Sequence, residues 1–128
     1  MAKREIPPDV RRFILTSIPS VPHIEALMLM RSTAPAKWTA KGISERLYVP
    51  PAVALAVLTD LCRSGMLLHD EALSIYFYES RPEPVCDIID SVASLYGTHL
   101  VEITMLIHSK LDRKAQQFAD AFHFRKEQ

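Results

Sequence analysis

The sequence predicts a single, mostly helical domain that contains one short β-hairpin. Apolar residues recur at spacings of three and four through most of the chain, which is the period of an amphipathic helix. Two short alternating segments, 66–68 and 73–78, flank the polar turn 69–72 and indicate the hairpin. Nine prolines fall between the periodic segments. A chain of 128 residues with 48% hydrophobic residues is long and apolar enough to bury one core.

Three helices are predicted before the middle of the chain. The first spans 9–18, with Asp9 as its cap, and the second spans 21–31, with Ser20 in the N-cap position. Trp38 lies in a short extended piece, and Thr39 is placed to cap a third helix over 40–47.

A fourth helix is predicted over 51–64. It begins with a proline, which a first helical turn tolerates well, and Gly65 is placed to end it in the left-handed conformation. Its inward stripe consists of Ala54, Val57, Leu58 and Leu61. The hairpin follows, and the prolines within 81–84 mark a break in the chain.

The remainder of the chain is predicted to be helical. A helix over 85–96 ends at Gly97. Segment 98–111 fits either a helix capped by Thr98 or an alternating strand, and its length favours the helix. Asp112 is then expected to open a last helix that carries a stripe with Phe118 and Phe122.

Two groups of residues carry a family resemblance. One is Trp38-Thr39 followed by Ile43-Ser44-Glu45-Arg46-Leu47, and the other is the run from Leu58 to Leu67, in which Gly65 separates a helix from an apolar strand. These features resemble the bacterial winged helix-turn-helix transcription regulators. The resemblance implies a mostly α (α+β) fold: a winged-helix module over 20–79 with a two- or three-stranded wing, and a helical C-terminal extension over 83–128.

The resemblance also implies a non-enzymatic regulator whose second motif helix enters the DNA major groove. Such a helix needs hydrogen-bonding side chains to contact base edges. The outward positions of helix 51–64 are mostly apolar instead, and the expected wing tip carries Asp70 and Glu71. The outward positions are Ala52, Val53, Leu55, Ala56, Thr59, Asp60 and Arg63.

Two functional hypotheses follow. In the first, the chain binds duplex DNA weakly and mainly through phosphates, with an affinity that falls steeply with salt. Its candidate contacts are Lys37, Lys41, Arg46, Thr59 and Arg63. In the second, it is a protein-interaction module, whose candidate contacts are Val53, Leu55 and Ala56, or Phe118 and Phe122 on the last helix. The competing interpretations are that helix 51–64 is buried on all sides by the C-terminal helices and that the cations form a solvated face.

Charge is balanced overall but uneven along the chain. Fifteen basic and fifteen acidic residues cancel, which is atypical of a strong nucleic-acid binder. Segment 31–66 has five cations against two carboxylates, whereas segment 67–109 has seven carboxylates against one arginine. An anion-binding face is therefore expected on the helix-turn-helix half or at the termini.

Other classes of function lack a signature. The five histidines show no metal-type spacing, and no phosphate-binding glycine loop or nucleophile motif is present, so we expect no enzyme activity, metal or cofactor. Asp87 and Asp90 form either a converging carboxylate pair or a solvated face. No membrane-spanning run or secretory signal is seen, and Cys62 and Cys86 are expected to be reduced thiols in a cytoplasmic protein. Regulators of this type often dimerise through helices outside the module, so a homodimer is expected.

Overall fold

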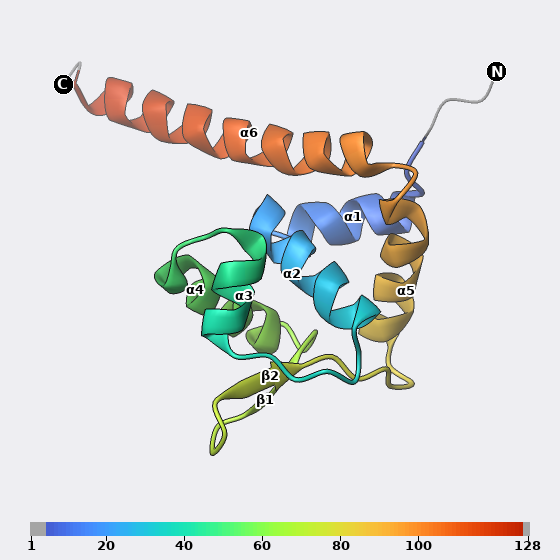
Figure 1. Ribbon diagram of the computed structural model, residues 1–128. Helices are drawn as coiled ribbons and strands as arrows, with labels where there is room; N and C mark the ends of the chain where they lie inside the picture. The colour runs from blue at the N-terminus through green and yellow to red at the C-terminus, as the bar shows by residue number, and fades with distance from the viewer. Residues whose placement is uncertain (1–4, 127–128) are drawn as a thin grey trace.

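The computed structural model describes residues 5–126, apart from the side chains of Asp112 and of residues 122–126. Within them the chain is mostly helical, with one small antiparallel sheet (Figure 1). The elements in order are α1 (Pro8–Ser17), α2 (Val21–Ser32), α3 (Ala40–Leu47), α4 (Pro51–Arg63), β1 (Leu68–Asp70), β2 (Ile75–Phe77), α5 (Pro84–Tyr96) and α6 (Leu100–Lys126).

Helices α2, α3 and α4 pack together above the hairpin of β1 and β2. In the hairpin Leu68 pairs with Phe77. The segment before α3 adds one further bridge, because Trp38 and Tyr76 exchange backbone hydrogen bonds of 2.8 and 2.7 Å. The extended piece predicted at Trp38 is thus confirmed, and it lies against β2 on the side away from β1.

The capping residue, the glycine and the apolar stripe predicted for α3 and α4 behave as the sequence indicates. The Thr39 hydroxyl accepts the Gly42 N–H at 3.0 Å and caps α3. Gly65 has a φ of +75°, which a residue without Cβ adopts at little cost. The predicted inward stripe of α4 is buried throughout, and it packs on α2 and α3.

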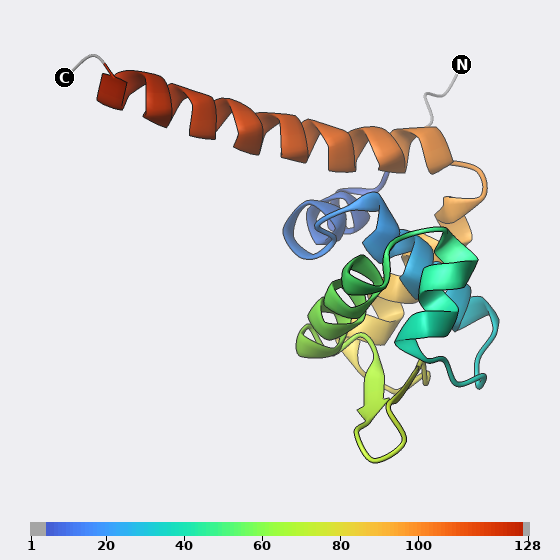
Figure 2. The same ribbon diagram turned by 60° about the vertical axis from the view of Figure 1, so that its left-hand side comes forward.

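The C-terminal helices form a second layer with α1. Ile103 and Ile107 of α6 are fully buried, and α6 packs on α1 and α5. Beyond this contact α6 continues away from the body, and its C-terminal end lies far from the other helices in both views (Figures 1 and 2). The hairpin lies at the opposite side of the molecule from α6.

One prediction for the C-terminal third is confirmed and one is wrong. The segment that fitted either a helix or a strand is helical from Leu100 onward, as favoured, but Asp112 does not open a separate helix, because α6 runs unbroken from Leu100 to Lys126. The physical reason is that this segment contains no proline or glycine, so nothing interrupts its backbone hydrogen bonds.

The hairpin and two caps also differ from expectation. Asp9 does not cap α1, because this helix begins at Pro8 and Asp9 lies within its first turn. The turn spans 71–74 rather than 69–72, with Ser74 at a φ of 52° and the Asp70 carboxylate accepting the Leu73 N–H at 3.3 Å. Ser20 holds the N-cap position of α2 but makes no side-chain cap. Its hydroxyl is hydrogen-bonded to the His23 ring instead.

Candidate interaction surface

The turn between α3 and α4 is held in one conformation by Ser44. This buried serine donates its hydroxyl to the Val49 carbonyl at 2.7 Å. Its own carbonyl accepts the N–H groups of Tyr48 and Val49. The arrangement closes α3 and places Tyr48 in the left-handed region, with φ 57° and ψ 46°.

Tyr48 is the most exposed large apolar residue in the described part of the chain, at 94% of its surface. The left-handed conformation costs a residue with a Cβ about 1–2 kcal/mol, and glycine or asparagine usually occupies such a position. Here a tyrosine occupies it without burying its ring. The sequence carries no signal for this strain, since only the backbone angles reveal it.

The first half of α4 exposes an apolar face beside this turn. Val53 and Leu55 are 39% and 49% exposed, and Ala52 and Ala56 are exposed with them. The interpretation that this helix is buried on all sides by the C-terminal helices is therefore wrong, because α4 packs on α2 and α3 instead. We call Tyr48, Ala52, Val53, Leu55 and Ala56 the α4 surface.

The N-terminus of α4 is poorly equipped to bind a phosphate. Helix N-termini bind anions through free backbone N–H groups. Pro50 and Pro51 have none, and the N–H groups of Val53 and Ala54 both donate to the Pro50 carbonyl. In this first turn, only Ala52 keeps an N–H without a partner among the described residues.

The five candidate DNA contacts are spread over three segments: Lys37 lies in the loop before α3, Lys41 and Arg46 lie on α3, and Thr59 and Arg63 lie on α4. Lys37 sits over the Phe77 ring of the hairpin at 4.4 Å, and Lys41 lies 4.0 Å from Glu45 on α3. Arg46 lines a hollow of about 500 Å³ with residues of α2 and α5. Thr59 is half-buried, and Arg63 is exposed at the last residue of α4. The structure therefore does not gather these side chains into a single cluster.

Asp60, which the sequence placed on the outward face of α4, takes part in a polar chain that sequence reasoning missed. The buried His23 bonds through Nδ1 to the Ser20 hydroxyl and through Nε2 to the Asp60 carboxylate at 2.9 Å. Hydrogen bonds that link a serine, a histidine and an aspartate in this order can activate the serine hydroxyl as a nucleophile. The five pockets of about 300–530 Å³ are lined by other residues, so we assign this chain a structural role in tying α4 to α2. The spacing of Ser20 and His23 within one helical turn was its only signal in the sequence.

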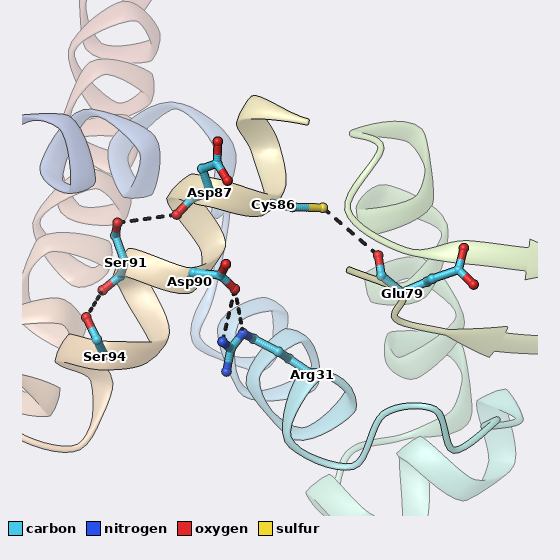
Figure 3. A network of polar contacts seen from close by, with 7 residues as sticks. All are labelled: Arg31, Glu79, Cys86, Asp87, Asp90, Ser91 and Ser94. Atoms are coloured by element: carbon cyan, nitrogen blue, oxygen red, sulfur yellow. Dashed lines mark hydrogen bonds and ion pairs between the residues drawn. The ribbon is translucent and has the colours of Figure 1, made fainter. Parts of the chain in front are cut away.

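A second polar network joins the helical extension to the rest of the body. Arg31 of α2 donates from Nε and Nη2 to one carboxylate oxygen of Asp90 on α5, at 3.2 and 3.0 Å (Figure 3). Asp87 points away from Asp90 in this view, and the Ser91 hydroxyl donates to its backbone carbonyl rather than to its carboxylate. The two aspartates do not form a converging carboxylate pair.

The partner candidates on α6 are only partly described. Phe118 is 74% exposed, and every described side chain in 111–121 is exposed. This segment therefore does not pack on the body of the described chain. The Phe122 side chain lies outside the described residues.

The described residues hold neither a metal-ligand cluster nor a single membrane-spanning helix. No group of three or more His, Cys, Asp and Glu side chains is placed to hold a metal ion. No single helix is both long and apolar enough to cross a membrane, and α1 with α2 meets that test only as a pair bent by 114°. Both thiols are free; Cys86 is buried, and burial raises the pKa of the half-buried Cys62.

Comparison of the chain with protein-family models, with curated proteins and with solved structures yields no match.

Proposed function

We propose that this protein is a winged-helix regulatory module that acts by binding another protein through the α4 surface. The order of elements supports the winged-helix assignment: a helix, the extended Trp38, two further helices and a hairpin. The Trp38–Tyr76 bridge supplies the third strand position of a wing, next to β2.

One observation favours a protein partner over DNA. The helix that would read DNA in a winged-helix regulator exposes alanines, Val53 and Leu55 in its first half, beside a strained and fully exposed tyrosine. Apolar side chains offer base edges few hydrogen bonds, whereas aromatic residues are enriched at protein interfaces. Strain held at an exposed residue is typical of sites with a function.

A second candidate function is weak, phosphate-dominated binding of duplex DNA. The exposure of Lys37, Lys41, Arg46 and Arg63 on the basic half of the chain favours it. The acidic hairpin turn and the proline start of α4 weaken it. This function predicts low affinity with a steep dependence on salt.

Two double variants separate the candidates. Val53→Asp with Leu55→Asp places two charges on the α4 surface, and both side chains are exposed enough for the fold to tolerate the change. Lys41→Glu with Arg46→Glu reverses two exposed cations on α3. Each variant and the wild type are titrated against random-sequence duplex DNA by fluorescence anisotropy at low and moderate salt. The same proteins then serve as baits in quantitative affinity purification.

We expect a protein partner that is retained by the cation variant and lost by the Val53/Leu55 variant, with little DNA binding by any of the three. DNA binding that collapses with salt and is abolished only in the cation variant contradicts the proposal and supports the second candidate. Unaltered partner and DNA binding in both variants excludes both surfaces.

A further inference from the structure

The hollow that Arg46 lines lies where three helices meet. Its volume is about 500 Å³, and its lining comes from α2, from the last turn of α3 and from the last turn of α5. Cavities of this size bind small molecules rather than folded partners. We call it the α2/α3/α5 hollow.

Apolar side chains form much of the lining of this hollow. Met28 is buried, and Leu29, Leu47 and Ala93 are half-buried beside it. Met28 belongs to the hydrophobic core, and the other three pack against that core. The lining therefore suits the apolar part of a ligand, whose contact with it would remove apolar area from water.

Two charged side chains of opposite sign also line the hollow, and each lacks a partner. Glu25 of α2 is half-buried and Arg46 of α3 is exposed, and neither makes a hydrogen bond or an ion pair within the described residues. Burial and, to a smaller extent, the charge of Glu25 raise the pKa of Tyr96 on α5. The Glu25 carboxylate therefore lies close to that phenol.

A third charge at the hollow is already compensated. Arg31 donates from Nε and Nη2 to the carboxylate of Asp90 (Figure 3), so this pair adds little net charge. Arg31 Nη1 has no acceptor among the described residues and stays available for a hydrogen bond. The uncompensated charges of the hollow are thus one negative charge from Glu25 and one positive charge from Arg46.

We propose that the α2/α3/α5 hollow binds a small zwitterion with an apolar body, of the class of the apolar α-amino acids. The ligand carboxylate pairs with Arg46, its ammonium group pairs with Glu25, and its side chain lies on the apolar lining. A guanidinium group fits a carboxylate well, because its N–H groups form a planar fork. A ligand with a single charge would leave Glu25 or Arg46 partly removed from water without a partner, which costs free energy.

The test is isothermal titration calorimetry of the full chain, without DNA, against L-leucine, L-methionine and L-phenylalanine. Two analogues of leucine each lack one charge: isocaproate has no ammonium group, and isoamylamine has no carboxylate. Leucine is expected to bind at least about 10-fold more tightly than either analogue, because each lost contact is a hydrogen bond between charged groups. Failure of all three amino acids to bind overturns the proposal, as does an analogue that binds as tightly as leucine.

Variants of the lining locate the ligand. Arg46→Gln and Glu25→Gln each remove one charge and are expected to weaken leucine binding by about 10-fold or more. Arg12→Gln and Glu71→Gln make the same changes at exposed positions outside the hollow and are expected to bind leucine like the wild type. Circular dichroism verifies that every variant is folded.

Gly97→Phe tests the hollow by steric exclusion. Gly97 lines it with a φ of −69°, and a Cβ at this position would meet no atom within 4 Å, so the backbone accepts a side chain there. This variant is expected to lose leucine binding while its fold is retained.

Amide NMR shifts on addition of leucine to the wild type are expected to centre on the lining residues of α2, α3 and α5. Shifts centred elsewhere overturn the proposal, as does wild-type affinity in either Arg46→Gln or Glu25→Gln. The α4 surface lies outside the hollow, so the outcome is independent of the proposed function.

Discussion

Tyr78 places a phenol hydroxyl in the interior of the body without a hydrogen-bond partner among the described residues. Burial raises the pKa of Tyr78 to about 12, and the neighbouring Cys86 and Asp90 side chains add to the rise. The ordinary pKa of tyrosine, near 10, applies in the unfolded chain. Because the native state retains this proton longer, the titration of Tyr78 leaves the free energy of unfolding unchanged below pH 10 and lowers it as the pH rises from about 10 to about 12.

Tyr78→Phe is expected to remove this loss of stability at alkaline pH. At neutral pH the variant gains about 1 kcal/mol in the free energy of unfolding, because it no longer buries an unpaired hydroxyl. Its advantage over the wild type grows above pH 10. Urea unfolding measured between pH 7 and pH 11 gives both quantities. Parallel curves for the two proteins across this range would contradict the assignment.

Tyr48 and Asp60 show why single residues are hard to interpret from sequence. The role of Tyr48 depends on its backbone angle, and the role of Asp60 depends on its hydrogen bond with His23. Neither property has a local sequence signature, because one arises from the closure of a turn and the other from a residue 37 positions away.

At the scale of the element, α3 depends on its cap. It has only eight residues, and helices this short need satisfied terminal groups and packing to persist. Thr39 supplies the cap, and Ile43 and Ser44 supply the buried face. The position of the turn between α3 and α4, and hence of Tyr48, follows from where α3 starts and ends.

Thr39→Ala is expected to lower the free energy of unfolding by about 1 kcal/mol, because the Gly42 N–H loses its acceptor. Thr39→Ser keeps the oxygen and should retain most of the stability. Chemical denaturation compares the three proteins. Equal losses in the alanine and serine variants would indicate that packing of the threonine methyl, rather than the cap, stabilises this end of the helix.

At the scale of the whole molecule, α6 consists of two parts with different surroundings. Up to Ile107 it packs on α1 and α5, and from Leu111 its described side chains are exposed. Truncation of α6 should therefore lower the free energy of unfolding only when it reaches Ile107.

A chain that ends at Leu111 is expected to keep the unfolding free energy of the monomeric body within about 0.5 kcal/mol of the full chain. A chain that ends at Leu106 also loses the buried Ile107 and should be destabilised by about 2 kcal/mol or more. Thermal and urea unfolding, carried out at concentrations where both proteins are monomeric, measure the difference. A large loss already in the longer chain would show that the projecting segment packs on the body.

The sequence by itself determined the number and order of most elements, the α3 cap, the glycine end of α4 and the buried stripe of α4. These are consequences of spacing, proline, glycine and capping residues, which act within a few positions of the chain. The same local rules gave the hairpin, although they placed its turn two residues too early.

Only the tertiary structure decided which faces stay exposed and which polar groups meet. It left the outer side of α4 and the described side chains of α6 from Leu111 onward in solvent, and it paired Arg31 with Asp90 and His23 with Asp60. The physical reason is that an apolar stripe predicts that one face of a helix is buried but does not indicate which surface covers it. Whether a helix is covered depends on the length and direction of its neighbours, and α1 is too short to follow α6 to its end.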